Sequence, residues 1–153
     1  QPSLPGGTGP TGFNIERIVY TYLDYLLSQG ASPKLARDPG YEVVFRNSGE
    51  HFFPQHADRG DHDWDAVAPD DPELNMFGNL ALVSVSANSK FSNALPLAKT
   101  TKEREIKQSK KLELMANITR ASGHWNRQSI RDHDKEMIDL LRDDLASAAS
   151  STL

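Results

Sequence analysis

At 153 residues, the chain is long enough for one domain with its own core but short for two. It contains no cysteine, which excludes disulfides, cysteine-ligated zinc and thiol catalysis. No run approaches the roughly 18 apolar residues of a membrane span, and the first residues lack the basic and apolar regions of a signal peptide. We therefore expect a cytoplasmic protein with no membrane segment.

The formal net charge of −4 conceals a strong asymmetry along the chain. Residues 58–73 hold seven acidic residues and one basic residue, whereas residues 99–111 hold six basic residues and two acidic ones. Because Lys and Arg provide non-specific affinity for nucleic acid, the total charge argues against DNA as a partner. The basic stretch can still bind phosphate locally. The alternative is that both stretches are solvated surface.

The first two segments differ in composition. Residues 1–12, QPSLPGGTGPTG, have the proline and glycine content of a linker, which predicts a tether to something upstream; the alternative is a frayed terminus. Residues 13–29 predict a helix, with Asn14 as its N-cap and Gly30 at its end. Its apolar stripe consists of Ile15, Ile18, Val19, Tyr22 and Leu26, widened by Leu23 and Leu27.

Two predicted strands follow. The sequence YEVVF, residues 41–45, is β-branched and aromatic, which favours a strand. Residues 56–75 are acidic and contain two prolines, so they predict a loop in which Trp64 is an apolar anchor. Residues 79–88, NLALVSVSAN, predict a second strand that is mostly buried.

The rest of the chain is predicted to be helical. Residues 87–99 form a short helix that ends near Pro96, and residues 100–118 form a longer one, broken by Gly123. The last helix, residues 127–147, has a continuous apolar stripe. These elements predict an α+β fold, a mostly helical domain around one small two-stranded element. The predicted organisation is a linker at 1–12, one domain at 13–147 and a tail at 148–153.

The residues that carry chemistry begin in the stretch GEHFFPQH, residues 49–56. Phosphodiester hydrolysis needs a base to deprotonate water and a divalent cation to neutralise charge on the phosphate. Mg²⁺ takes oxygen ligands, often only one or two of them from protein. Glu50 and His51, together with asparagines at 79, 88 and 93, can supply these groups.

Neighbouring side chains on a strand point to opposite faces, so Glu50 and His51 cannot both enter a pocket from a flat strand. Gly49 and Pro54 allow the chain to bend, and the two intervening phenylalanines would anchor the turn in the core. We therefore expect Glu50 and His51 to flank a metal and a phosphate from different sides.

These motifs resemble a known family. The patterns EHFFP, GNLAL and NSKFSN are similar to those of HNH, or ββα-metal, endonucleases, and most closely to the C-terminal nuclease domain of GmrSD-type modification-dependent restriction proteins and the related phage-defence protein SspE. The signature is an acid, His, two residues and Pro, then an asparagine followed nine positions later by a second; here these are Glu50, His51, Pro54, Asn79 and Asn88. Glu50 stands where aspartate is also common. The resemblance covers most of residues 13–147.

The resemblance implies a role for each matched residue. His51 would be the general base, and Glu50 and Asn88 would bind one divalent metal, Mg²⁺ or Mn²⁺. Asn79, counted among the catalytic residues, would hold the loop and orient the histidine. The two asparagines can also exchange these duties.

Each residue also has a structural alternative. Asn79 follows a glycine and can be a turn residue, and Asn88 can cap the following helix. Lys90 can touch phosphate, with Asn93 beside it at helical spacing. The remaining predicted nucleic-acid contacts are the lysines of a basic stretch that can equally be a solvated helix face: Lys99, Lys102, Lys107, Lys110 and Lys111. Metal binding is the minor alternative for His56 and His62, and His124 and His133 are expected at the surface or in packing.

The function expected from these residues is metal-dependent nicking of DNA in a bacterial anti-phage or restriction protein, as a monomer or homodimer. By resemblance, an upstream nucleotide-hydrolysing domain would sense DNA modification; no P-loop occurs in this chain, so we expect no NTP hydrolysis from it alone. The alternative is a catalytically inactive nucleic-acid-binding or regulatory interaction domain, and RNA is a third, less favoured substrate.

Overall fold

The structure, a computed structural model, describes residue 12, residues 15–57 and residues 67–151. Within these residues there is one sheet of two antiparallel strands, β1 (Ser48–His51) and β2 (Leu80–Val83). Glu50 pairs with Ala81 and His51 pairs with Leu80. Every residue of β2 is buried, so the sheet lies inside the domain. The predicted mostly helical α+β class is confirmed.

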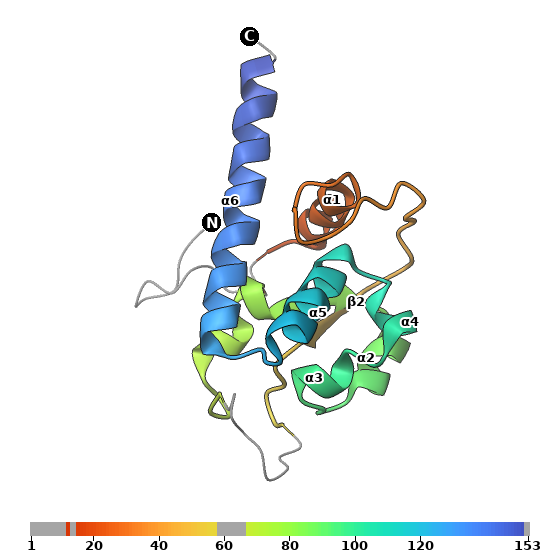
Figure 1. Ribbon diagram of the computed structural model, residues 1–153, viewed down its shortest axis with the longest axis vertical. Helices are drawn as coiled ribbons and strands as arrows, with labels where there is room; N and C mark the ends of the chain where they lie inside the picture. The colour runs from red at the N-terminus through yellow and green to blue at the C-terminus, as the bar shows by residue number, and fades with distance from the viewer. Residues whose placement is uncertain (1–11, 13–14, 58–66, 152–153) are drawn as a thin grey trace.

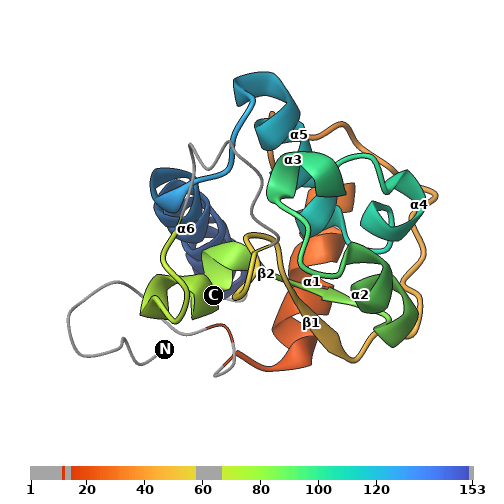
Figure 2. The same cartoon turned by 90° about the horizontal axis from the view of Figure 1, so that it is seen from below.

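Helices and short helical turns surround this sheet (Figure 1). They are α1 (Arg17–Ser28), the 3-10 helices η2 (Pro72–Asn75) and η3 (Phe77–Asn79), α2 (Val85–Phe91), α3 (Pro96–Lys99), α4 (Glu103–Ile106), α5 (Lys110–Ser122) and α6 (Arg127–Ser151). Helix α1 packs against β2 and α2 packs against β1 (Figure 2). The long helix α6 stands along one side of the molecule, and its C-terminal part extends beyond the other elements (Figure 1).

Helix α6 contacts η3 closely because of one glycine. A Cβ at Gly78 would lie 2.3 Å from the carbonyl oxygen of Ile130 and 2.6 Å from the Cβ of Asp134, so only glycine fits between the two helices. The amide of Gly78 donates to Asp134 Oδ1 at 2.8 Å. This contact fixes η3, which ends at Asn79, against α6.

The predicted strand at 41–45 is wrong, since the chain is extended there without strand pairing and β1 begins only at Ser48. Val43 and Phe45 are 50% and 83% exposed. The segment is held at its two ends by side chains: the hydroxyl of Tyr41 donates to the carbonyl of Gln108 at 2.8 Å, and Arg46 forms a buried ion pair with Asp24. The β-branched composition therefore occurs in a segment that pairs with no strand among the described residues.

The same ion pair explains a second difference, in α1. The buried residues of this helix are Tyr20, Leu23, Asp24, Leu27 and Ser28, while Ile18 and Tyr22 of the predicted stripe are 66% and 42% exposed. Asp24 faces inward because it also accepts hydrogen bonds from Ser109 Oγ and the amide of Lys111. Because a buried carboxylate needs these hydrogen-bond donors, the buried face of α1 is centred nearer to Asp24 than the predicted apolar stripe is.

Caps and a proline account for the helix boundaries that differ from the predictions. The predicted strand 79–88 stops at Val83 because Ser84 caps α2, accepting from the amide of Ala87 at 3.1 Å. Pro96 begins α3 rather than ending a helix, as proline is tolerated in a first turn. The predicted helix 100–118 is two helices, because Ser109 caps α5.

Helix ends agree better with the predictions where glycine adopts a positive φ. Gly123, with φ 84°, ends α5 as expected, and Gly30, with φ 93°, follows the end of α1. Helix α6 runs to Ser151, four residues past the predicted end. Several predictions lie outside the described residues: the cap Asn14, the anchor Trp64, His62, nearly all of the linker, and residues 58–66 of the acidic loop.

Candidate active site

Most of the residues predicted to carry chemistry, but not Asn79, line one pocket of about 360 Å³. Its lining, here called the candidate pocket, consists of Gly49, Glu50, His51, Pro54, Gln55, His56, Asn88, Ser92 and Asn93. Glu50 and His51 end β1, and Asn88 and Asn93 come from α2 and the turn after it. A Cβ at Gly49 would meet no atom within 4 Å, so the predicted need for glycine in a bend has no steric basis there.

Glu50 is buried and forms an ion pair that the sequence did not predict. Lys99 Nζ lies 2.6 Å from Glu50 Oε2, at an angle outside hydrogen-bond geometry, and the two side chains are 0% and 3% exposed. The same ammonium donates to the main-chain carbonyl of His51 at 2.7 Å. Burial raises the pKa of Glu50 and lowers that of Lys99, and the attraction between the two charges opposes both changes.

His51 is half-buried and its ring is held by an asparagine from η2. Nε2 of His51 lies 2.9 Å from Asn75 Oδ1. Burial lowers the pKa of His51 below its ordinary value; the hydrogen bond to Asn75 opposes this, and the charge of Lys99 adds to it. The ring is therefore neutral at pH 7, which is the protonation state that a general base requires.

Asn79 has no exposed surface, and its side-chain amide makes four hydrogen bonds. Oδ1 accepts from the amide of Phe53 at 2.9 Å and from Trp125 Nε1 at 3.2 Å, and Nδ2 donates to the carbonyls of Phe53 and Leu74 at 3.0 and 2.9 Å. All of its hydrogen-bonding capacity is thus used within the protein. Asn79 therefore fixes the turn that follows His51, and its four hydrogen bonds go to groups other than the imidazole ring.

Asn79 belongs to a larger buried group. Lys111 Nζ donates to the carbonyls of Phe77 and Leu80, on either side of Gly78 and Asn79 in the chain, at 2.8 and 2.6 Å. We call Gly78, Asn79, Lys111 and Trp125 the support cluster. These two hydrogen bonds tie η3 to β2 from the interior. Burial lowers the pKa of Lys111 to about 7.

Asn88 is half-buried within α2 and does not cap it, because Ser84 does. Its Nδ2 donates to Ser48 Oγ at 2.8 Å, which links α2 to β1. Within the described residues Oδ1 of Asn88 has no hydrogen-bond partner. This oxygen therefore has lone pairs available to coordinate a metal ion. Asn93 is exposed at the edge of the candidate pocket.

The predicted lysine track is wrong for three of its members. Lys99, Lys110 and Lys111 are 1%, 3% and 1% exposed, so they cannot form a surface for DNA. Carboxylates or main-chain carbonyls bind all three side chains; Lys110, for example, pairs with Asp38 and Glu113. Lys102 and Lys107 are exposed as predicted, and Lys90 is exposed beside Glu105, 3.6 Å away.

The sequence analysis missed the contacts that two residues make in the site. Asn75, which contacts His51, ends an acidic loop, and Lys99 lies in a stretch that has the composition of solvated surface. For Lys99 a signal did exist, because the aliphatic segment ALPLAK places it among apolar residues. Asn75 carries no signal, since its role depends on where η2 lies relative to β1.

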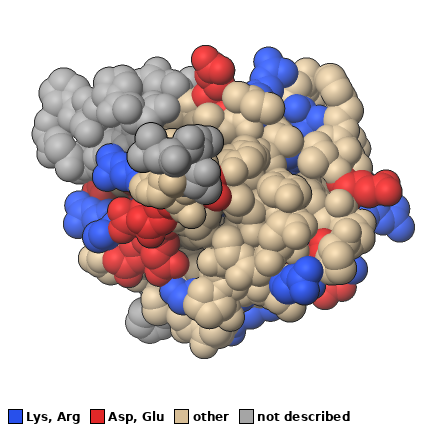
Figure 3. All heavy atoms as spheres, turned by 90° about the horizontal axis from the view of Figure 1, so that it is seen from above, with Lys and Arg blue, Asp and Glu red and all other residues tan. Residues whose placement is uncertain are grey.

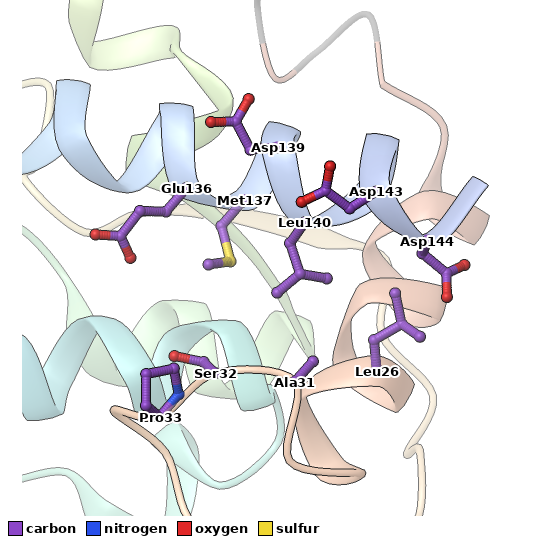
Figure 4. A pocket seen from close by; sticks show the side chains of 10 residues that line it. All are labelled: Leu26, Ala31, Ser32, Pro33, Glu136, Met137, Asp139, Leu140, Asp143 and Asp144. Carbon is purple, nitrogen blue, oxygen red and sulfur yellow. The ribbon is translucent and has the colours of Figure 1, made fainter. Parts of the chain in front are cut away.

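A second, larger pocket of about 430 Å³ lies between α6 and the end of α1 (Figure 4). Apolar side chains including Leu26 and Leu140 line it, and four acidic residues of α6 surround them: Glu136, Asp139, Asp143 and Asp144. Seen from the C-terminal end of α6, acidic side chains gather on one side of the molecule (Figure 3). This pocket contains no histidine, and its charge opposes the approach of a phosphate backbone.

The donor set of the candidate pocket fits a hard cation with few protein ligands. Among the described residues there is no cluster of three or more His, Cys, Asp or Glu side chains that could hold a metal ion. Glu50 and Asn88 Oδ1 provide two oxygen donors, which matches Mg²⁺ or Mn²⁺ bound mainly by water and substrate rather than Zn²⁺. In the part of the chain that the structure covers, no helix is long and apolar enough to cross a membrane.

Comparison with known proteins gives one match. The family model described as GmrSD restriction endonucleases, C-terminal domain, matches residues 11–140. The comparisons with curated proteins and with solved structures found no match. The matched range contains the candidate pocket and the support cluster and ends within α6.

Proposed function

Because the chain belongs to the family of GmrSD restriction endonuclease C-terminal domains, the nuclease domain of a restriction system, we propose that it hydrolyses DNA phosphodiesters with His51 as general base and one divalent cation held by Glu50 and Asn88. The observation that carries this proposal is the candidate pocket, which all three residues line. They come from positions up to 38 apart in the chain, so sequence proximity alone does not explain their convergence.

His51 has the properties of a base. It lines the candidate pocket, and its neutral ring can accept a proton from water at pH 7. The carbonyl of His51 is held by Lys99 and the turn after it by Asn79, so the main chain that follows His51 is fixed. Such support keeps a catalytic group within the narrow geometry that proton transfer requires.

Glu50 and Asn88 provide oxygens on two different elements, β1 and α2. Lys99 contacts one oxygen of Glu50, and a carboxylate has a second oxygen that can bind a cation. A bound Mg²⁺ or Mn²⁺ would supply positive charge to the phosphate and the leaving oxygen. Exposed Lys90, Lys102 and Lys107 are proposed to contact the DNA backbone.

Plasmid nicking in Mg²⁺ or Mn²⁺ tests this proposal. We expect His51→Ala to lower the rate by about 10²- to 10⁴-fold, the usual contribution of general acid–base catalysis. His124→Ala, a substitution outside the candidate pocket, is the matched control and should retain activity. One site of this kind cuts one strand, so a monomer should nick and a double-strand break would require a second site. Full activity of His51→Ala would refute the proposal.

The alternative, an inactive nucleic-acid-binding or regulatory domain, has one observation in its favour. The ammonium of Lys99 already balances the charge of Glu50 without a metal. Thermal unfolding with increasing Mn²⁺ separates the two functions, because a ligand that binds only the folded state raises the unfolding temperature. We expect a rise for the wild-type protein and none for Glu50→Gln; no rise in either would favour the inactive domain.

The biological setting is also a proposal. An upstream domain that hydrolyses nucleotides and senses DNA modification would control this nuclease, in a cytoplasmic defence against phage. Comparing the nicking of modified and unmodified phage DNA would show whether the domain itself distinguishes them.

A further inference from the structure

Asn75 contacts the ring of the proposed base. It is the last residue of η2, and its Oδ1 lies 2.9 Å from His51 Nε2. Gln55 Nε2 donates to the same oxygen at 3.4 Å. Asn75 is half-buried, and it lies 24 positions from His51 in the chain, so the fold rather than local sequence creates the contact.

The chemistry of this contact determines where the imidazole proton lies. A carboxamide oxygen accepts hydrogen bonds and cannot donate one. His51 Nε2 must therefore carry the proton, and in the neutral ring Nδ1 is then the nitrogen that bears the basic lone pair. With the opposite tautomer, the lone pairs of Nε2 and Oδ1 would face each other at 2.9 Å, which is unfavourable.

Asn75 is itself held firmly by its own helix. Asp71 Oδ1 caps η2 at the amide of Glu73, 2.9 Å away. The carboxylate of Glu73 accepts from Arg131 at 2.6 and 2.8 Å and from Arg127 at 2.5 Å. Helix α6 therefore fixes η2 from outside by ion pairs.

The inner side of η2 is fixed as well. The carbonyl of Leu74 accepts from Asn79 Nδ2 at 2.9 Å, which ties the residue before Asn75 to the support cluster. A hydrogen-bond acceptor held on both sides in this way can impose one orientation on the ring that it contacts.

We propose that Asn75 is a positioning residue for the nuclease reaction, which orients the ring of His51 and keeps its proton on Nε2, so that Nδ1 is the atom that accepts a proton from water. This inference rests on the proposed function of His51. It divides between two asparagines a duty expected of one: Asn79 fixes the main chain after His51, and Asn75 fixes the ring.

Nitrogen-15 NMR of the histidine rings at neutral pH tests the tautomer directly. Comparison with His51→Ala assigns the signals of His51. We expect the wild-type ring to carry its proton on Nε2, and Asn75→Ala to give a mixture of the two tautomers. A wild-type proton on Nδ1 would overturn the inference whatever the variants do.

Nicking kinetics provide the second measurement. Asn75→Ala should lower kcat by about 10- to 100-fold, typical for loss of a group that orients a catalytic one, with KM nearly unchanged. Asn75→Asp should restore most of kcat, since its carboxylate accepts the same hydrogen bond. Asn117→Ala is the matched control: this half-buried asparagine donates to the carbonyl of Lys34 at 3.4 Å and accepts from Arg120 at 3.1 Å, and it does not line the candidate pocket, so both readouts should stay at wild-type values.

The outcomes separate this inference from the proposed function. If His51→Ala is inactive while Asn75→Ala keeps both the wild-type tautomer and wild-type kcat, the inference fails and the function stands. If His51→Ala is fully active, the proposed function itself fails. If Asn75→Ala and Asn75→Asp lose kcat equally while both remain folded, acceptance of the hydrogen bond is not what matters and the inference is wrong.

Discussion

The support cluster and the candidate pocket lie next to each other but are built differently. In the support cluster, Asn79 and Trp125 have no exposed surface, and the amide of Asn79 uses all of its hydrogen-bonding capacity. In the candidate pocket, His51 and Asn88 are half-buried, and Asn88 Oδ1 has no partner among the described residues. Groups that stabilise a fold satisfy one another, whereas groups that act on a substrate keep bonding capacity unused. Substitutions in the two regions should therefore affect different measurements.

The largest effect is expected for Asn79→Ala. It leaves buried donors and acceptors of Phe53, Leu74 and Trp125 without partners, each of which costs about 1–3 kcal/mol. The free energy of unfolding in urea should fall by at least about 4 kcal/mol, a large part of the stability of a small domain. His51→Ala is the control from the candidate pocket and should stay close to wild type in this measurement. An Asn79→Ala protein that is fully stable yet inactive would place Asn79 with the catalytic groups instead.

Lys99 lies at the border between the two regions, because it is fully buried yet bonded to Glu50 and to the carbonyl of His51. Lys99→Met leaves the carboxylate of Glu50 buried and unpaired, which should lower the free energy of unfolding by about 3–5 kcal/mol. Adding Glu50→Gln removes that charge and should recover most of this loss in a double-mutant cycle. The double variant should not nick DNA, since Glu50→Gln removes a proposed metal ligand.

The Lys99 variants test whether the support cluster and the candidate pocket are independent. If the double variant recovers stability but not activity, the Lys99–Glu50 ion pair contributes both to folding and to the proposed metal site. If Glu50→Gln adds nothing to Lys99→Met, the stability comes from the bond to the carbonyl of His51 rather than from the ion pair.

Some of this arrangement could be predicted from the sequence and some could not, and the difference has physical causes. Strand β2 and the glycine that ends α5 were predictable because each follows from a local pattern, and Glu50, His51 and Asn88 were singled out by motifs that lie close to short elements. The strand at 41–45 was predicted wrongly because β-propensity depends on a pairing partner, which that segment does not have.

Long-range contacts set the remaining features. The inward turn of Lys99, Lys110 and Lys111 depends on carboxylates and carbonyls up to 72 residues away, and a run of charges in sequence is the same whether it is solvated or buried. The contact of Asn75 with His51 depends on α6 holding η2 in place. No local periodicity in the sequence encodes the inward turn of the lysines or the position of Asn75.

The smallest expected effect is the contribution of His133 to the pH dependence of the free energy of unfolding. Its ring packs edge-to-face on Trp125 of the support cluster, with 5.6 Å between the ring centroids. His133 is fully buried, and within the described residues neither ring nitrogen has a hydrogen-bond partner. Burial lowers its pKa well below the ordinary value of about 6.5, and the charges of Lys111 and Lys34 lower it further.

The sign of this effect follows from proton binding. Below pH 6.5 the unfolded chain protonates this histidine while the folded state does not, so the free energy of unfolding falls as pH falls. One such group contributes at most about 1.4 kcal/mol per pH unit, and nothing above its unfolded pKa. Urea unfolding of wild type and of His133→Phe, which keeps an aromatic ring against Trp125, should show a shallower decline in the variant between pH 6.5 and 5. Equal slopes would mean that His133 takes up a proton in the folded state, and that this side of the support cluster is open to solvent like the candidate pocket.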